Sequence, residues 1–327
     1  MKAIVIDHFG GPDALIIKEV PNPESKPGHV TIQVKAFGLN HAETHMRKGE
    51  WDEWNPITGL ECVGIVAACP DGQFAVGSKV AALMGGMGRN IPGSYAEYTC
   101  VPASNVMPIE SSLPWEQLAA LPETYVTAWS CLFGILNVER GQKLLIRGAT
   151  SSLGQAAVNL AVNAGAVVTA TTRKRERFQQ LKKMGVTAAE LEGPNLARQY
   201  TPEHGQASKF DAVLNLIGNS VLLESLGIVR RGGRVLQAGW LGGLAPIADF
   251  NPMVEMPSGV HFSLFHSKVL GGPEFPLSEV PLQEIVRHIE KGDWTAQPSH
   301  VFEFGDIREA HKLLDLGDAN GKVVVRH

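Results

Sequence analysis

The sequence predicts an α/β protein in two parts, one rich in strands and one built on a parallel, doubly wound sheet. Two patterns and one compositional bias support this fold class. Short runs of alternating apolar and polar residues, separated by Gly and Pro, fill most of residues 1–117. From Leu118 onward, apolar strands alternate with helical segments, which is the pattern of right-handed βαβ crossovers. The 35 glycines suit sharp turns from strand to helix.

The first part is expected to contain short strands, and its periodicity places them. We expect strands at Lys2–Asp7, Leu15–Val20, His29–Ala36 and Val63–Ala68. In the third of these, Val30, Ile32, Val34 and Ala36 fall on one face, as in a strand with one buried side. This part has no βαβ pattern.

The second part is expected to alternate strands and helices. We expect strands at Lys143–Arg147, Ala166–Thr172, Phe210–Ile217 and Arg234–Ala238. We expect helices at Leu153–Ala164, Arg177–Met184 and Ser220–Val229. The C-terminal stretch predicts helices at Leu282–Glu290 and Ile307–Leu314, the second with Asp306 as N-cap and Glu309 three residues on, and a final strand at Lys322–Arg326.

Bulk composition limits the classes of protein that this chain can be. Its 327 residues are enough for two domains, and its net charge of −4 gives no general attraction to nucleic acid or to an anionic membrane. No run of 18 apolar residues predicts a transmembrane helix, and charges at Lys2 and Asp7 precede any signal-peptide core. The four cysteines form no CxxC pair, so we expect reduced thiols. These features favour a cytoplasmic protein.

A phosphate-binding turn is the strongest local signal. The strand Lys143–Arg147 runs into Gly148, Ser151 and Gly154 at a spacing close to the GxGxxG dinucleotide fingerprint, with small residues in place of some glycines. Such a turn brings the backbone and a helix N-terminus against a pyrophosphate. Tight packing alone would also explain small residues there. The candidate contacts in the turn are Gly148, Thr150, Ser151, Ser152, Leu153 and Gly154.

The end of the next strand decides which cofactor the turn suits. An Asp or Glu normally stands there to bind the ribose 2′-hydroxyl of NAD. This chain has Thr172, Arg173 and Lys174 instead, followed by Arg177. Guanidinium and ammonium groups pair with a 2′-phosphate, so the sequence predicts NADPH as cofactor. A solvated basic turn is the simpler alternative.

Several motifs together resemble the medium-chain dehydrogenase/reductase superfamily, in its zinc-independent quinone oxidoreductase branch. They are Gly59–Val66, Gly93–Tyr98, Gly148–Gly154, Phe210–Val213, Glu309–His311 and Gly321–Val325. The resemblance implies a GroES-like catalytic domain from residues 1–117 plus 268–327, with a Rossmann NADP-binding domain at 118–267 inserted. It further implies cofactor contacts at Asn215, Ile217, Gly218, Gly239, Phe262 and Ser263.

Zinc-dependent relatives carry metal ligands at positions that match Asn40, Leu60 and Glu123 here. Leucine cannot ligate, and zinc prefers thiolate and imidazole to an amide. A rival pair, His41 and His45, lacks an obvious third ligand. We therefore expect no metal, which leaves acceptors that take hydride readily.

The resemblance also supplies catalytic candidates, and each has a structural alternative. Asn40 would hydrogen-bond a substrate carbonyl or cap a strand end. Thr127 would lie near the nicotinamide or simply pack in a helix. Trp51 stands where many relatives have a tyrosine, so the phenolic proton donor is lost and an aromatic wall would remain. Glu123 would act as the proton donor in place of that tyrosine, or its carboxylate would be buried and bind backbone groups.

These points predict an NADPH-dependent reductase of quinones or similar activated carbonyl compounds. The alternatives are an enone or enal double-bond reductase of the same superfamily and a non-catalytic NADPH-binding protein of crystallin type. The expected partner is a small hydrophobic substrate, with neither nucleic acid nor membrane. A homodimer is expected because relatives pair Rossmann edge strands, here within Val260–Ser267.

Overall fold

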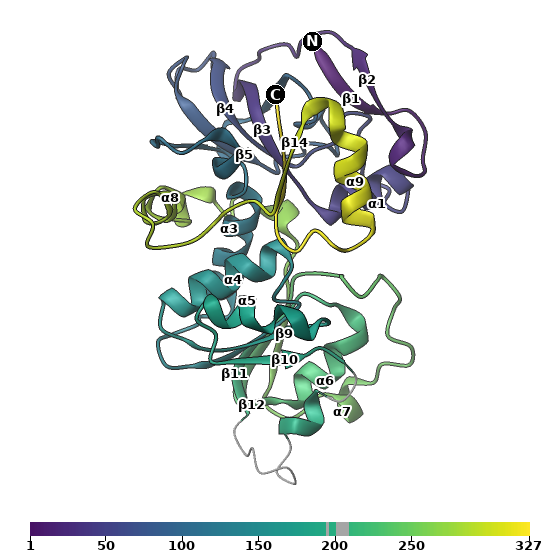
Figure 1. Cartoon of the computed structure of the whole chain (residues 1–327), viewed down its shortest axis with the longest axis vertical. Coiled ribbons are helices and arrows are strands. Elements are labelled where there is room, and N and C mark those ends of the chain that lie inside the picture. The colour runs from purple at the N-terminus through teal and green to yellow at the C-terminus, as the bar shows by residue number, and fades with distance from the viewer. Residues whose placement is uncertain (194–195, 201–208) are drawn as a thin grey trace. The chain divides into compact units, whose positions relative to one another are not determined.

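The computed structural model describes residues 1–193, 196–200 and 209–327. The chain divides into two compact units, Met1–Val126 with Ser267–His327 and Thr127–His266 (Figure 1). The expected boundaries were residues 117 and 268. The first observed boundary lies after Val126 instead, within the helix α3 (Pro122–Trp129).

Unit 1 is built mostly on antiparallel strand pairs, and its two C-terminal strands pair in parallel. A two-stranded sheet joins β1 (Lys2–Ile6) and β2 (Leu15–Glu19). The larger sheet has the order β14 (His300–Glu303), β15 (Val323–Arg326), β3 (His29–Leu39), β4 (Glu61–Ala68), β5 (Lys79–Leu83) and β7 (Val106–Pro108), and β6 (Tyr98–Pro102) also pairs with β3. Because β15 pairs with β3, residues from near both ends of the chain complete one sheet.

Short helices cover unit 1. They are α1 (His41–Lys48), α2 (Trp115–Leu118), the start of α3, α8 (Leu282–Glu290) and α9 (Ile307–Asp315). In α8, Leu282, Ile285, Val286 and Ile289 are buried, which is the spacing of an amphipathic helix. Asp306 is the N-cap of α9, as expected, but its side chain makes no cap hydrogen bond, because the residue also ends a 3₁₀ turn at Phe304–Asp306.

Unit 2 is a six-stranded parallel sheet. Its order is β10 (Ala188–Leu191), β9 (Val167–Thr172), β8 (Lys143–Arg147), β11 (Phe210–Asn215), β12 (Val229–Gln237) and β13 (His261–Leu264). The chain moves outward from β8 in one direction and from β11 in the other. The strand order therefore reverses between β8 and β11, where doubly wound sheets bind ligands at the carboxyl edge.

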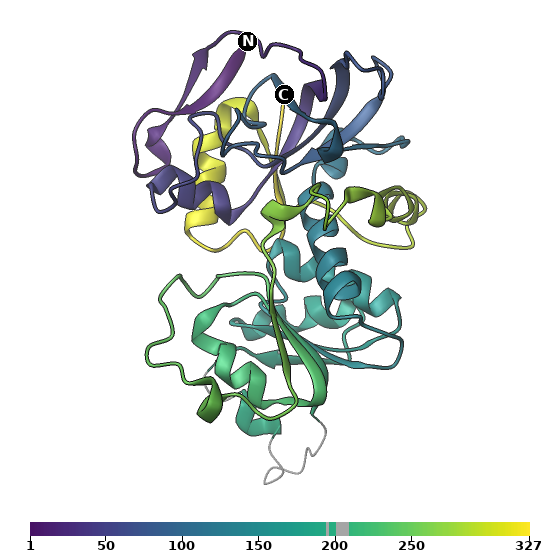
Figure 2. The ribbon, with the colours of Figure 1, turned by 180° about the vertical axis from the view of Figure 1, so that it is seen from behind.

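Helices pack on both faces of this sheet. Right-handed crossovers place α4 (Ser152–Asn163) and α5 (Phe178–Lys183) on one face and α6 (Leu222–Gly227) on the other, as Figures 1 and 2 show. A short helix, α7 (Pro252–Glu255), precedes β13. The apolar core beneath α6 includes Leu145, Val213, Leu226 and Val235. The two-faced burial explains why these strands are continuous apolar runs.

Several expected bounds shifted by a few residues. The expected helix at Ser220–Val229 is shorter, a 3₁₀ turn at Asn219–Val221 followed by α6. The expected strand Arg234–Ala238 begins earlier, at Val229, because β12 takes in the Arg-Arg-Gly-Gly stretch through a register irregularity against β11. The helix expected from Arg177 starts as a 3₁₀ turn at Arg175–Arg177, before α5.

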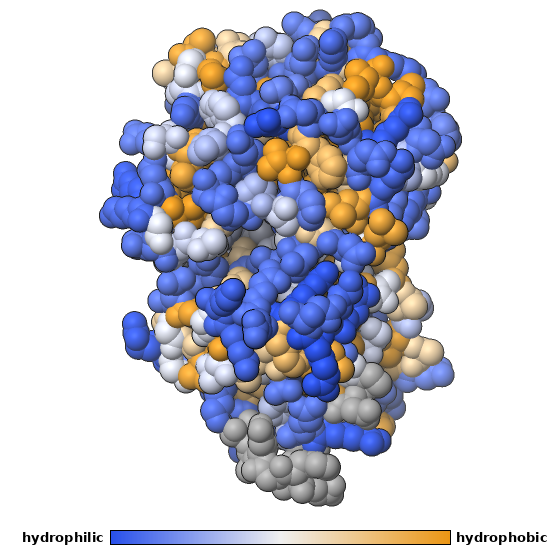
Figure 3. Space-filling model, in the orientation of Figure 1, coloured by the Kyte–Doolittle hydropathy of each residue, from blue (hydrophilic) through white to orange (hydrophobic). Residues whose placement is uncertain are grey.

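The thiols and the surface agree with the composition. No disulfide joins any two cysteines of the described residues, and Cys62 and Cys131 are buried. Within the described ranges, every helix is too short or too polar to cross a bilayer. On the face seen in Figure 3, hydrophilic residues cover most of each unit and apolar residues lie in small separate groups.

Candidate functional site

The turn after β8, Gly148–Gly154, forms a cradle for a phosphate group, and its close backbone contacts leave room for glycine alone at position 154. A Cβ on Gly154 would lie 2.4 Å from the carbonyl oxygen of Gly148 and 2.7 Å from Cα of Ala149, both backbone atoms. Gly148 itself has φ +81°, a conformation that glycine adopts without strain. Ser151 caps α4, since its Oγ accepts a hydrogen bond from the Gly154 amide at 3.1 Å. The helix N-terminus is thus held against the strand end.

The neighbouring strand ends complete the same edge of the sheet. Oδ1 of Asn215, at the end of β11, accepts the amides of Ile217 and Gly218, each at 3.0 Å. A Cβ on Gly148 would lie 3.2 Å from Cδ1 of Ile217, so this loop borders the cradle. Gly239 follows β12, and a Cβ there would lie 2.7 Å from the Leu216 carbonyl oxygen. The structure therefore brings four of the expected cofactor contacts to the carboxyl edge of the parallel sheet: Asn215, Ile217, Gly218 and Gly239. Phe262 and Ser263 lie within the edge strand β13 instead.

Basic side chains follow the end of β9. Thr172 is buried there, and its hydroxyl lies 3.3 Å from that of Thr150 in the cradle. Arg177 donates to the Thr150 hydroxyl at 3.4 Å, which orients its guanidinium toward the cradle. Arg173 and Lys174 are exposed between these two points. Of the expected cationic residues, Arg177 thus contacts the phosphate-binding turn.

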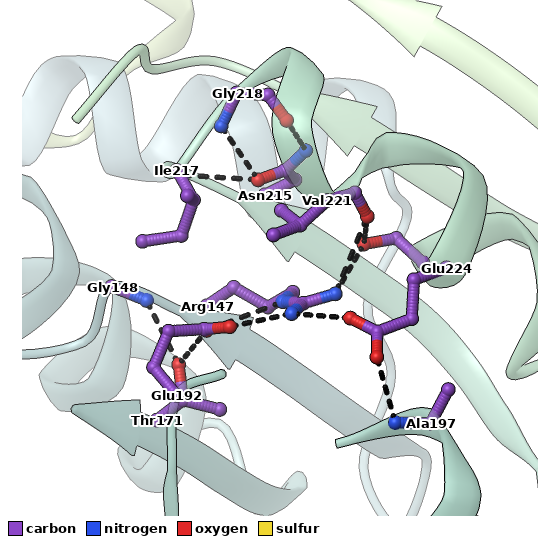
Figure 4. Close-up of polar contacts among 11 residues, drawn as sticks. Arg147, Gly148, Thr171, Glu192, Ala197, Asn215, Ile217, Gly218, Val221 and Glu224 are labelled. Carbon is purple, nitrogen blue, oxygen red and sulfur yellow. Dashed lines mark hydrogen bonds and ion pairs between the residues drawn. The ribbon is translucent and has the colours of Figure 1, made fainter. Parts of the chain in front are cut away.

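A buried ion-pair network supports the cradle from within. Arg147, the last residue of β8, is fully buried and contacts the carboxylates of Glu192 at 2.5 Å and Glu224 at 2.6 Å (Figure 4). Glu192 also accepts from the Thr171 hydroxyl at 2.6 Å, and Thr171 accepts the Gly148 amide at 3.0 Å. Hydrogen bonds therefore connect the turn of the cradle to the buried guanidinium. They also occupy the Glu192 carboxylate.

Unit 1 contains a second buried polar cluster, formed by Asn40, Glu43, Glu61 and Lys322. The Asn40 amide nitrogen donates to Glu43 at 3.2 Å and to Glu61 at 3.1 Å. The Lys322 ammonium donates to the Asn40 oxygen at 2.6 Å and also contacts Glu61. Both glutamates are fully buried and Lys322 is 4% exposed. Asn40 therefore directs its amide at carboxylates, and a bond to a substrate carbonyl would replace one of these contacts.

Burial and charge set the protonation of this cluster. Burial raises the pKa of Glu43 from 4.5 to about 7, and Lys322 acts in the opposite direction. Backbone amides of Asn40 and Leu60 also donate to the Glu43 carboxylate. The carboxylate is thus held at the protein interior by a cation and by three hydrogen-bond donors, rather than by water.

The donor set does not fit a zinc ion. Lys322 holds the Asn40 oxygen, and Leu60 is buried without any ligating atom. The backbone amide of Glu123 binds Glu61 at 2.8 Å, which places Glu123 beside the cluster. Among the described residues, no group of three or more His, Cys, Asp or Glu side chains could hold a metal ion.

Trp51 lies near a small cavity of unit 1, through its contact with Arg89. Trp51 stacks on His45, with ring centroids 5.2 Å apart, and His45 contacts Glu50 at 2.5 Å. The guanidinium of Arg89 lies over the Trp51 ring, 5.0 Å from its centroid, in a cation–π contact. A cavity of about 240 Å³ adjoins Arg89. Its walls include Glu53, Met84, Met87, Arg89, Asn90 and Lys268.

Sequence reasoning missed several of these residues. It did not identify Glu43, Glu61, Lys322, Arg89, Arg147 or Glu192. Two of them carried a signal: Glu43 follows Asn40 by three residues, as in a capping box, and Arg147 directly follows three apolar residues of a strand. Thr127 is buried in α3, where it begins unit 2.

Comparison with known families agrees with this architecture. The alcohol dehydrogenase GroES-like domain family matches residues 26–111. The family described as zinc-binding dehydrogenase matches residues 196–325. One match thus lies in unit 1, and the other covers the second half of unit 2 and the C-terminal part of unit 1.

Relatives are similar over nearly the whole chain. Human quinone oxidoreductase is 25% identical over 99% of this chain and 97% of its own length. A squalestatin tetraketide synthase of Cochliobolus lunatus is 28% identical over 91% of this chain but only 12% of its own length, so this chain spans a small part of that relative. A solved NAD-dependent alcohol dehydrogenase is 26% identical, with a TM-score of 0.82 and full coverage of both chains. The chain belongs to the medium-chain dehydrogenase/reductase superfamily and has the fold of an oxidoreductase of that superfamily.

Proposed function

We propose that this protein is an NADPH-dependent, zinc-independent reductase of quinones or similarly activated carbonyl compounds. The observation that carries the proposal is the edge of unit 2, where Arg177 contacts the glycine cradle and the exposed Arg173 and Lys174 follow the end of β9. Glu192, whose carboxylate accepts from Thr171 near the end of β9, is already paired with Arg147. A ribose 2′-phosphate therefore suits this edge better than a 2′-hydroxyl.

Different residues would bind the pyrophosphate, the 2′-phosphate and the acceptor. Backbone amides at the start of α4 would hold the pyrophosphate, since Gly148 and Gly154 leave no side chain in the way. Arg173, Lys174 and Arg177 would hold the 2′-phosphate. When bound, the nicotinamide supplies the hydride. Unit 1 would hold the acceptor against Met84 and Met87, which would also exclude water.

Zinc independence follows in this proposal from the buried cluster. The Lys322 ammonium already neutralises Glu61 and binds Asn40, so a dication there would meet a positive charge. Without a Lewis acid, a simple alcohol or ketone is a poor substrate, whereas a quinone needs none. Asn40 is then a positioning residue for Lys322 and Glu43.

An acceptor panel tests the function. Purified protein, pre-treated with a strong chelator, should oxidise NADPH with 1,4-naphthoquinone, followed at 340 nm, at the same rate as untreated protein. Turnover of enones but not quinones would favour the double-bond reductase, and NADPH binding without any turnover would favour the crystallin-type protein. Chelator-sensitive activity with stoichiometric zinc would contradict the proposal.

The edge strand β13 supports a further proposal, a homodimer. Phe262 is 38% exposed and Leu264 is 51% exposed on this outer strand of the parallel sheet. Two such edges would pair and cover these side chains. Light scattering after gel filtration should give twice the chain mass, and Leu264→Asp should give the monomer. Leu316→Asp, at an exposed leucine of unit 1, is the control. A monomeric parent protein would contradict the dimer.

A further inference from the structure

The cavity of unit 1 contains a cation that its surroundings leave incompletely paired. The side chain of Arg89 is only 13% exposed. Its Nε is buried and has no hydrogen-bond partner among the described residues. Its contact with Glu53 is long, at 3.4 Å, and that carboxylate is 48% exposed. Leaving a buried donor unpaired is unfavourable, so this geometry suits a ligand that accepts from it.

The charges around the cavity favour an anion. Arg89 and Lys268 line it with two positive charges, and Glu53, which contacts both, supplies one negative charge. Burial lowers the pKa of Arg89, and nearby Glu53 and Glu43 oppose this, so the guanidinium carries its charge in a poorly solvated position. A second negative group in the cavity would pair with the remaining positive charge. A carboxylate would also match the planar fork of the guanidinium.

The walls of the cavity favour a flat, apolar body. Trp51 holds Arg89 on its ring face, and Met84 and Met87 are buried beside it. Thioether side chains adapt to planar aromatic groups. The cavity volume of about 240 Å³ limits the occupant to a small molecule or to one end of a larger one.

The loop that carries Arg89 is fixed in place. Met84 has φ +58°, which is unusual for a residue with a side chain, and Gly85, Gly86 and Gly88 also have positive φ. A Cβ on Gly88 would lie 2.9 Å from the backbone nitrogen of Gly59, so this loop packs tightly on its neighbour. Strain of this kind persists where the surroundings determine the conformation, and it is found at ligand sites.

We propose that Arg89 is the specificity-determining residue of unit 1 and that it binds a carboxylate carried by the acceptor. The preferred acceptor is then a small quinone or enone with a carboxylate substituent, rather than a neutral one. The carboxylate accepts from Nε and Nη2 of Arg89, and the ring lies against Met84 and Met87. This inference rests on the proposed function for its acceptor class, but the binding of the carboxylate does not depend on turnover.

Binding is measured first, without cofactor, by quenching of tryptophan fluorescence. The probes are 2-naphthoate and the neutral 2-naphthalenemethanol. We expect the parent protein to bind the carboxylate at least tenfold more tightly, because a charge-assisted hydrogen bond to a buried donor is lost with the alcohol. Arg89→Met, which keeps an unbranched apolar stem but removes the guanidinium, should remove this preference, and Arg89→Lys should retain part of it. Arg326→Met, at an exposed arginine of the same unit, is the control. Equal binding of both probes by the parent protein, or a preference that survives in Arg89→Met, would overturn the inference.

Turnover is measured second, with 1,4-naphthoquinone and its 2-carboxylate. Arg89→Met should raise the KM of the carboxylated quinone at least tenfold and change that of the neutral quinone less than about threefold. Unequal probe binding together with no quinone or enone turnover would refute the proposed function and leave the carboxylate site standing. Turnover of both quinones with equal KM in the parent protein would refute the site and leave the function standing.

Discussion

Replacing Gly154 by alanine tests the cradle, because the structure gives the size of the clash. The added Cβ would lie 2.4 Å from the Gly148 carbonyl oxygen and 2.7 Å from Cα of Ala149. Both distances are about 1 Å shorter than an ordinary contact, and both involve backbone, which cannot rotate away. The start of α4 must therefore move away from the end of β8.

The cost of that movement can be estimated. Overpacking in a tight interior costs about 1–3 kcal/mol, and alanine in a helix recovers up to about 1 kcal/mol relative to glycine. We expect Gly154→Ala to lower the free energy of unfolding by about 1–2 kcal/mol. Loss of one hydrogen bond to a pyrophosphate oxygen should also weaken NADPH binding about tenfold or more.

A matched substitution in the same unit controls for helix propensity. Gly227 is exposed at the end of α6, and an added Cβ there meets nothing within 4 Å. Gly227→Ala should therefore be neutral or slightly stabilising and should bind NADPH as the parent protein does. Urea denaturation and titration calorimetry measure the two quantities. If Gly154→Ala matches Gly227→Ala in both, the cradle has been assigned to the wrong residues.

Two further predictions concern the buried charges. Arg147→Met should lower the free energy of unfolding by about 3–5 kcal/mol, because it leaves Glu192 and Glu224 buried without their cation. Adding Glu192→Gln to this variant should recover part of the loss. If the urea midpoint of Arg147→Met is close to that of the parent protein, the network does not have this role. The pKa of Glu43 is raised in the folded state from 4.5 to about 7. Its contribution to the free energy of unfolding, about 3 kcal/mol, is therefore fully present below pH 4.5 and is lost as the pH rises through 7. Urea denaturation from pH 5 to 7.5 should show this slope in the parent protein and a flatter one in Glu43→Gln, and equal slopes would contradict the raised pKa.

Local patterns were enough to predict most of the fold. The expected bounds of β8 and α8 agree with the structure because each has strong periodicity and clear flanking residues. The helix α1 was not predicted, since only eight polar-rich residues form it and its cap, Asn40, was considered as a substrate ligand. The short strands β10 and β14 have too few residues to show a period, and their neighbours in the sheet determine them.

The cradle could be predicted from the sequence, whereas the buried clusters could not. The residues of the cradle are contiguous, so spacing alone indicates them. Asn40 and Lys322 are brought together by the pairing of β15 with β3, across 282 positions. A single lysine near the end of a chain gives no sign of burial. Arg89 follows a glycine-rich loop, and its position on Trp51 depends on how that loop folds.

Calorimetric titration of NADPH and NADH tests the central claim most directly. We expect the parent protein to bind NADPH at least tenfold more tightly than NADH, a difference of about 1.4 kcal/mol. In the double variant Arg173→Ala, Lys174→Ala, NADPH binding should weaken toward that of NADH, which should itself stay almost unchanged. Arg175→Ala is the matched control, because Arg175 lies 6.0 Å from the Phe178 ring centroid and is not part of the proposed phosphate site. Equal affinity of the parent protein for both cofactors would contradict the account.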